Sequence, residues 1–298
     1  MNAEIRYDVD AADYHADSGS EKPSLSSSMA KILCTQSPLH AWTAHPKLNP
    51  AWRPTYSDVF DRGHVAHAVL LQGMDVVSLI TEAVDAKGNK KAIDDWRLQD
   101  AQRQREEARA AGKTPMLTHQ YGAVMDMVNT VSGQFAQTKT NPRPFSVGRP
   151  EVTIRWVDEG VPCRARLDWL SESMECIDDL KTLVDANPET IARKAVHDGW
   201  DIQAAFYVRG IEVLTGYRPK FRFVAVEADA PYAASIFRAE GSLMDLGERK
   251  RRLALEIFRK CSESGIWSAY PTTLQDVAVP EYEMERWLAK EESYVLGV

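Results

Sequence analysis

Two carboxylates and a lysine lie close together in the middle of the chain, at Asp168, Asp179 and Lys181. Residues 163–170 alternate between apolar and polar side chains, which is typical of a half-buried strand, and a second strand is expected over 174–181. Side chains in a strand repeat every two residues, so Asp179 and Lys181 share a face. With a tight turn between the strands, Asp168 becomes a diagonal neighbour of Asp179, within reach of one hard cation. This set predicts metal-dependent cleavage of phosphodiester bonds.

An Asp-x-Lys sequence also occurs on ordinary solvated strand faces, so the residues around it matter. Asn187 and Pro188 have the types that begin a helix, as N-cap and first helical residue. A second helical run starts near Trp200, and in it Gln203 and Tyr207 lie four residues apart, on one helical face. For the pair alone, the plainer interpretation is an interfacial amide beside a half-buried phenol.

Upstream, Gly63 and His67 lie one helical turn apart in a helix expected over 58–71. Glycine at this position allows backbone or DNA to approach closely. His67 could serve as a metal ligand, or it could be a buried histidine of the core.

In this order, the residues resemble the motifs of PD-(D/E)XK nucleases of the RecB-like branch, and they are most similar to the nuclease domain of RecE-type phage exonucleases (exonuclease VIII). The matching segments are Tyr14-His15, Leu25–Ser28, Gly63–His67, Cys163–Asp168, Asp179–Thr182 and Gln203–Tyr207. The resemblance spans roughly residues 14 to 270. It departs from the family pattern at Leu167, where proline is usual.

The resemblance implies an α/β fold: a PD-(D/E)XK restriction-endonuclease-like core with a central mixed sheet flanked by helices. It also implies a Mg²⁺ site, in which Mn²⁺ can substitute, because carboxylate and carbonyl oxygens suit hard cations. The implied ligands are Asp168, Asp179, the main-chain carbonyl of Leu180, and His67. Glu151 is a candidate outer acid at the start of the neighbouring strand.

The remaining candidate residues concern catalysis and DNA contact. Lys181 is expected to orient or activate the attacking water. Gln203 and Tyr207 are expected to contact the backbone of the scissile strand. Arg164 and Arg166, beside the first aspartate, are candidates for steering DNA by their charge.

The implied function is a magnesium-dependent DNA exonuclease that acts on duplex ends in phage-type recombination. The family likeness further implies a single-strand annealing protein as partner and a homo-oligomeric ring. Two alternatives stay open: a structure-specific endonuclease, and a catalytically inert DNA-binding protein of the same fold. Digestion of linear and closed circular DNA would separate them.

Composition sets wider bounds. The net charge of −7 weighs against DNA binding, although basic residues can still cluster locally. No apolar run reaches the roughly 20 residues that cross a bilayer, and the N-terminus lacks a signal-peptide pattern, so a soluble, cytoplasmic protein is expected. The cysteine spacing predicts neither disulfides nor zinc. Some RecB-like nucleases hold an iron–sulfur cluster, but here only Cys261 follows near the C-terminus, too few for its ligands.

The expected organisation is a flexible arm over residues 1–23, followed by a single nuclease domain over 24–298. A stretch dense in charge, at about 87–112, reads as a helical insertion that projects from the body. Other expected elements are helices over 26–45, 118–137 and 242–262 and strands over 151–156 and 221–226.

Overall fold

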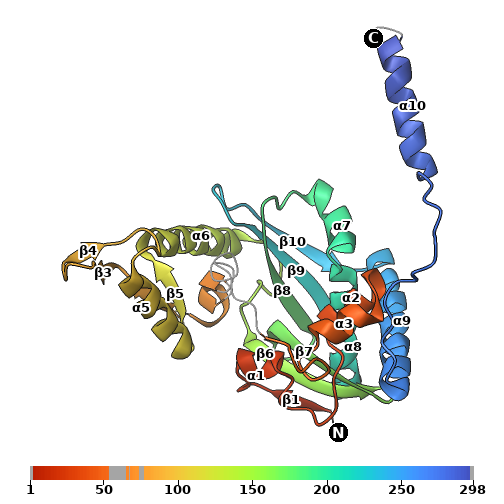
Figure 1. Ribbon diagram of the computed structural model, residues 1–298, viewed down its shortest axis with the longest axis horizontal. Helices are drawn as coiled ribbons and strands as arrows, with labels where there is room; N and C mark the ends of the chain where they lie inside the picture. Colours follow the sequence, from red (N-terminus) through yellow and green to blue (C-terminus); the bar gives the residue numbers. More distant parts are fainter. Residues whose placement is uncertain (1–2, 54–64, 67, 74–76, 296–298) are drawn as a thin grey trace. The chain divides into compact units, whose positions relative to one another are not determined.

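The computed structural model describes residues 3–53, 65–66, 68–73 and 77–295 (Figure 1). As described, the chain divides into two compact units, Met1–Ser268 and Ala269–Val298. His67 and Gly63, of the predicted metal-binding helix, lie outside the described residues. The expected nuclease domain, 24–298, runs through both units.

Within the described residues, a six-stranded mixed sheet forms the centre of the first unit, with strand order β1-β6-β7-β8-β9-β10. Its strands are β1 (Glu4–Arg6), β6 (Gly148–Asp158), β7 (Val161–Ser171), β8 (Cys176–Leu183), β9 (Lys220–Glu227) and β10 (Ala234–Ala239). β8 and β9 run parallel, and the other neighbours run antiparallel. Parallel neighbours require a crossover connection, and the helix that carries Gln203 lies in this connection.

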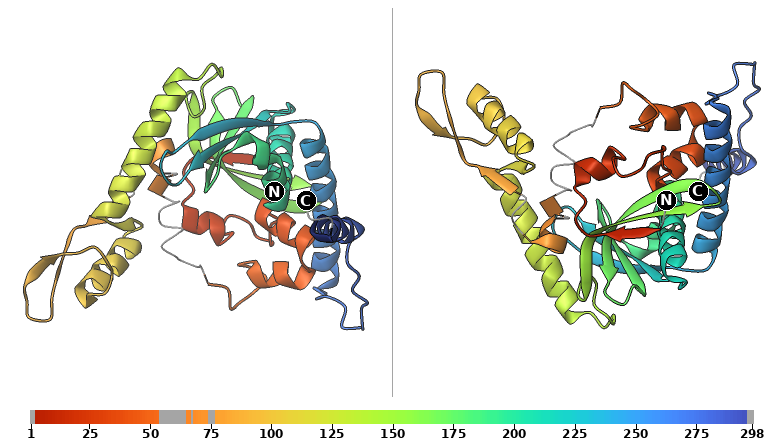
Figure 2. Two further views of the ribbon diagram at one scale, coloured as in Figure 1. Left: turned by 90° about the horizontal axis from the view of Figure 1, so that it is seen from above. Right: turned by 90° about the horizontal axis from the view of Figure 1, so that it is seen from below.

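The crossover consists of α7 (Pro188–His197) and α8 (Trp200–Thr215). α8 contacts β6, β7 and β9 and lies beside α9 (Ser242–Ser264), as Figure 2 also shows. Because α8 is covered by the sheet on one side and by α9 on another, most of its residues are buried. The largest fully buried side chains of the protein include Trp156, Phe206, Phe221, Phe223 and Phe258.

The helix expected over 26–45 is two helices, α2 (Ser27–Thr35) and α3 (Pro38–Ala44). Ser37, between them, is extended, with ψ of 160°. The ring of Pro38 disfavours the helical conformation in the residue before it, so the first helix cannot continue into the second.

The N-terminal segment differs from the loosely held arm that the sequence suggested. β1 pairs with β6, with Glu4 opposite Arg155, and Tyr14 is buried on α1 (Ala11–His15). The reason lies in the sheet, where Arg155 and Arg164 are buried on β6 and β7. Glu4 supplies the carboxylate for Arg155 at 2.8 Å.

Residues 77–117 form two small sheets and a helix. β2 (Val77–Ile80) pairs with β5 (Thr114–Leu117), β3 (Glu82–Val84) pairs with β4 (Lys90–Ala92), and α5 (Gln99–Ala110) follows. The charged stretch at 87–112 therefore contains a strand as well as a helix. α5 contacts β2, β3 and β5, and its buried residues are Ala101 and Ala108, small side chains that let it pack closely.

Helix α6 (Thr118–Gln137) confirms the helix predicted over 118–137. Its residues Met127 and Val131 pack in one buried cluster with Leu180 of β8 and Val224 of β9. Side chains alternate across a strand, so the face of β8 opposite α6 is the one that presents Asp179 and Lys181.

The second unit contains α10 (Glu281–Val295), which the sequence analysis did not predict. Apolar side chains of this helix are exposed, among them Met284, Trp287 and Leu288. Among all the helices described in the chain, none is both long and apolar enough to span a membrane.

Charge pairs along α9 yield a prediction about stability. Burial raises the pKa of Glu248, but hydrogen bonds and charge from Arg251 and Arg252 outweigh it and lower that pKa to about 2. A depressed carboxyl pKa stabilises the fold above the unfolded value, and this stability is lost as pH falls through the folded value. Glu248→Gln should therefore lower the free energy of unfolding by about 2 kcal/mol at pH 7.

The measurement is urea denaturation of both proteins from pH 7 downwards. The difference should shrink as pH falls from the ordinary glutamate range, near 4.5, toward about 2. Glu256→Gln is the control, because Glu256 pairs with Lys260 on the exposed side of the same helix and should leave stability nearly unchanged. A pH-independent difference would contradict the charge assignment.

Candidate active site

The two predicted aspartates lie on β7 and β8 next to the last paired residues of these strands. Trp169 pairs with Asp178, so the same register places Asp168 opposite Asp179, where the ladder ends. The connection over residues 172–175 is longer than the tight turn expected from the sequence. The two carboxylates are therefore direct neighbours across the strands, rather than diagonal ones.

Asp168 reaches across to β8. Its Oδ2 accepts a hydrogen bond from the main-chain N–H of Leu180 at 2.7 Å. The carboxylate thus satisfies a backbone donor at the point where strand-to-strand pairing stops. This contact fixes the side chain of Asp168 beside the Asp-x-Lys segment.

Asp179, Lys181 and Gln203 form a closed set of contacts. The Nε2 atom of Gln203 donates to Oδ1 of Asp179 at 2.7 Å, and Nζ of Lys181 donates to Oε1 of Gln203 at 2.7 Å. Lys181 Nζ lies 2.6 Å from Asp179 Oδ2. Asp179 is 0% exposed, so this carboxylate depends on its two partners for compensation. Gln203, expected at the DNA, here orients the carboxylate and the lysine.

Two aromatic residues beside Lys181 were missed by sequence reasoning. Nζ of Lys181 lies 5.6 Å from the ring centroid of Trp200 and 5.9 Å from that of Phe223. Trp200 stands one helical turn before Gln203, a spacing that places both on one face and could have revealed it. Phe223 lies opposite Asp179 in the parallel pairing of β8 and β9, which no local sequence pattern indicates.

Tyr207 follows Gln203 by one turn, as predicted, but it is buried. Burial is the main cause that raises the pKa of Tyr207 well above its ordinary value, and the charges of Asp179 and Asp168 add to it. The phenol therefore stays protonated at neutral pH. The structure brings Tyr207 to the site as an enclosed group, not as a surface group that faces a DNA strand.

Arg164 and Arg166 differ from the DNA contacts expected of them. Arg164 is 4% exposed; its Nη1 donates to the carbonyl oxygen of Ser24 at 2.7 Å and lies 3.2 Å from Asp17. Arg166 Nη1 donates to the carbonyl oxygen of Val9 at 2.6 Å. Both guanidinium groups thus hold the N-terminal segment on the sheet, and for the buried Arg164 these acceptors replace water.

Glu151 lies on β6 between residues paired with Trp169 and Leu167, at the level of Asp168. Its φ is +53°, an unusual conformation for a residue with a side chain. Its Oε2 accepts a hydrogen bond from Nε of Arg166 at 2.5 Å. Its role as an outer acid stays a prediction, and the structure supplies the position from which it would act.

The oxygen donors fit a divalent cation. Oδ2 of Asp179 is buried and accepts no hydrogen bond from the described residues, and the group that faces it is itself a cation, the Lys181 ammonium. In the described ranges, no group of three His, Cys, Asp or Glu side chains could hold a metal ion. Asp168, Asp179 and the Leu180 carbonyl remain the candidate ligands, and the predicted imidazole of His67 falls outside those ranges.

Comparison with known proteins gives a family and a fold. Residues 26–274 match a family described as a PDDEXK-like domain of unknown function (DUF3799). No curated protein matches the chain. A similar solved structure is the crystal structure of a putative exonuclease from Eubacterium rectale, with a TM-score of 0.59 and 12% identity over 93% of this chain and 97% of that one. These findings confirm the predicted central mixed sheet flanked by helices.

The buried position of Arg164 yields a prediction that separates a structural role from DNA contact. Arg164→Gln should lower the free energy of unfolding by about 3 kcal/mol, because it leaves the buried Asp17 carboxylate without its charge partner. Arg193→Gln, at an exposed position of α7, should change it by no more than about 0.5 kcal/mol. Chemical denaturation measures both. If Arg164→Gln kept the wild-type stability but bound DNA more weakly, the original prediction that Arg164 contacts DNA would be supported.

Proposed function

Because the chain belongs to the family of PDDEXK-like domains, we propose that it is a metal-dependent nuclease that hydrolyses DNA phosphodiester bonds. The observation that carries the proposal is the contact set of Asp179, Lys181 and Gln203 beside Asp168. A buried carboxylate, a lysine and a second carboxylate from the neighbouring strand are the groups that this reaction needs.

Asp168, Asp179 and the carbonyl of Leu180 would hold the cation, Mg²⁺ in this proposal, with Mn²⁺ as a substitute. When bound, a divalent cation supplies positive charge for the phosphoryl oxygens and makes a bound water more acidic. The amide of Gln203 keeps the carboxylate of Asp179 oriented toward this position.

Lys181 acts on the attacking water. Its side chain is 18% exposed, so Lys181 is mostly enclosed but not sealed from solvent or substrate. From this position the Lys181 ammonium orients the water by hydrogen bonding and stabilises the negative charge that develops as the bond to phosphorus forms, and the proton that the water loses passes to solvent. Glu151, which lies on β6 at the level of Asp168, serves as the outer acid in this proposal.

The finer proposal is an exonuclease that acts on duplex ends in phage-type recombination. It rests on the RecE-like order of motifs, and the description of the Eubacterium rectale protein as a putative exonuclease supports it. A ring of identical subunits and a single-strand annealing protein belong to the same proposal. The exposed apolar face of α10, with Trp287 and Leu288, supports a protein partner. A structure-specific endonuclease and an inert DNA-binding protein remain the alternatives.

Digestion of linear and covalently closed circular duplex DNA with Mg²⁺ tests the proposal. An exonuclease degrades the linear form and leaves the closed circle intact. Cleavage of the circle would identify an endonuclease. Binding without degradation of either form would identify the inert alternative.

Substitution of the buried aspartate tests the metal site. Asp179→Asn keeps the side-chain volume but removes a charged ligand, so the cleavage rate should fall by about two to three orders of magnitude. Asp178→Asn is the matched control, because Asp178 forms an ion pair with Arg222 at 2.5 Å. It should lose stability yet still cleave DNA below its melting temperature. Wild-type rates in Asp179→Asn would refute the ligand assignment.

Substitution of the lysine separates catalysis from phosphate binding. Lys181→Met keeps the stem and removes the ammonium, so turnover with Mg²⁺ should fall at least about a hundredfold, while affinity for DNA ends in Ca²⁺ stays unchanged. Lys260→Met, at an exposed position of α9, should change neither quantity. Loss of affinity together with rate would make Lys181 a phosphate anchor, and an unchanged rate would remove it from the mechanism.

A further inference from the structure

The Lys181 ammonium is bordered by aromatic rings as well as by polar groups. Besides Asp179 and Gln203, it faces the rings of Trp200 and Phe223 at 5.6 and 5.9 Å. These rings contact each other, with centroids 5.0 Å apart and planes inclined by 36°. Both are buried, at 5% and 2% exposure. The rings therefore form one continuous aromatic wall beside the ammonium.

The main chain fixes this wall in place. Trp200 is the first residue of α8 and follows Gly199, whose φ is +75°, a conformation that suits glycine. A Cβ atom at Gly199 would lie 2.9 Å from the side chain of Lys31, so a larger residue at this turn would have to displace that side chain. Phe223 is held by the pairing of β9 with β8. The aromatic wall is thus set by the turn on one side and by the sheet on the other.

An ammonium is attracted to the negative face of an aromatic ring, most strongly where water is excluded. At this site the attraction has a specific consequence. Asp179 is the charged partner of Lys181, and it is also a proposed metal ligand. Once Asp179 shares its charge with a cation, the carboxylate holds the ammonium less strongly. The rings and the Gln203 amide are not ligands of the cation, so their attraction for the ammonium remains.

We propose that Trp200, supported by Phe223, is a positioning residue that keeps the Lys181 ammonium at the reacting water when Asp179 binds a divalent cation. This inference rests on the proposed nuclease function. It assigns no contact between Trp200 and DNA, because the ring acts through Lys181.

The kinetic test is a double-mutant cycle. Trp200→Leu should lower kcat by about 3- to 30-fold, the range expected for loss of a partly buried cation–π contact, with KM for DNA unchanged. Trp200→Phe keeps a ring face and should retain most of the rate. In a Lys181→Met background, Trp200→Leu should have no further effect. An equal loss in both backgrounds would overturn the proposal.

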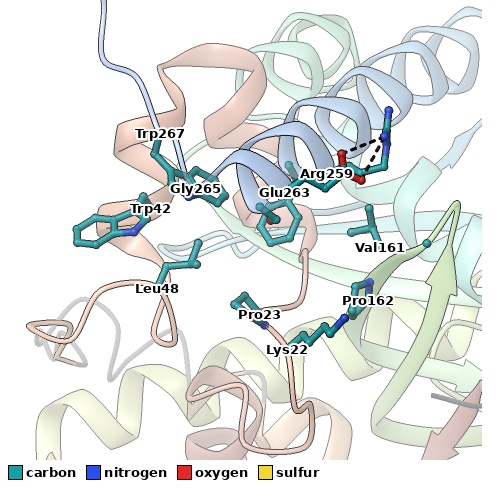
Figure 3. Close-up of a pocket in the computed structure, with 13 residues that line it drawn as sticks. Lys22, Pro23, Trp42, Leu48, Val161, Pro162, Arg259, Glu263, Gly265 and Trp267 are labelled. Atoms are coloured by element: carbon teal, nitrogen blue, oxygen red, sulfur yellow. Dashed lines mark hydrogen bonds and ion pairs between the residues drawn. The ribbon is translucent and has the colours of Figure 1, made fainter.

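The control is Trp267→Leu. Trp267 lies at a groove lined also by Trp42, Leu48 and Phe258 (Figure 3). The ring centroids of Trp267 and Phe258 are 5.6 Å apart. This variant removes a partly buried tryptophan without touching Lys181. It should keep the wild-type kcat. That result would show that loss of a tryptophan does not by itself slow turnover.

A second measurement needs no nuclease activity. In metal-free protein labelled with ¹³C-lysine, the ε-methylene protons of Lys181 should resonate upfield because of the ring currents, and the signal is assigned by its absence in Lys181→Met. Trp200→Leu should return it toward the ordinary lysine position, and Trp267→Leu should not. An unshifted signal would overturn the proposal even if DNA is cleaved. A shifted signal in a protein that cleaves no DNA would instead locate the failure in the proposed function.

Should Trp200→Leu fail to fold, Phe223→Leu and Trp200→Phe provide the same comparison. Each weakens the aromatic wall in part, so each should lower kcat and reduce the upfield shift by less than the full effect. No change in either quantity for Phe223→Leu would overturn the proposal.

Discussion

The buried carboxylate of Asp179 is the constraint on which the site depends. A charge removed from water is tolerated only when partners replace its hydration. Asp179 has two, the Gln203 amide on one oxygen and the Lys181 ammonium against the other. Gln203 can reach it because α8 crosses over the sheet between the parallel strands β8 and β9. The crossover between β8 and β9 therefore supplies one of the two groups that compensate the buried charge of Asp179.

The neighbouring Asp178 shows how one strand serves two purposes. It points to the opposite face of β8, where Nε and Nη2 of Arg222 donate to its two oxygens at 2.5 and 2.8 Å. The main-chain N–H of Phe145 also donates to it. One carboxylate thus fastens β8 to β9 and to the loop before β6, while the next in sequence is reserved for the site. Alternation along the strand separates these two roles.

Local periodicity predicted the part of the site that lies within single elements. Spacing placed Asp179 and Lys181 on one strand face and Gln203 and Tyr207 on one helical face, whereas the expectation that the two pairs meet came from the family resemblance. The fate of Arg164 did not, because its acceptors Ser24 and Asp17 come from a distant segment that no local pattern connects to β7. Because Arg164 is buried, it holds the N-terminal segment on the sheet instead of contacting DNA as expected. The break at Pro38 was accessible to sequence reasoning, since the residue before proline avoids the helical conformation.

The main-chain amide of Leu180 donates a hydrogen bond to the carboxylate of Asp168, which is a candidate metal ligand. In most of a sheet, slow exchange of an amide proton with solvent reflects pairing with the next strand. Here a side-chain carboxylate protects the proton, and the same carboxylate is a candidate ligand. In the proposed metal site, a cation bound to this carboxylate would compete with the amide for its oxygens and change that protection. The exchange rate of a single backbone amide, at the centre of an otherwise ordinary strand, would then measure whether the proposed metal site is occupied.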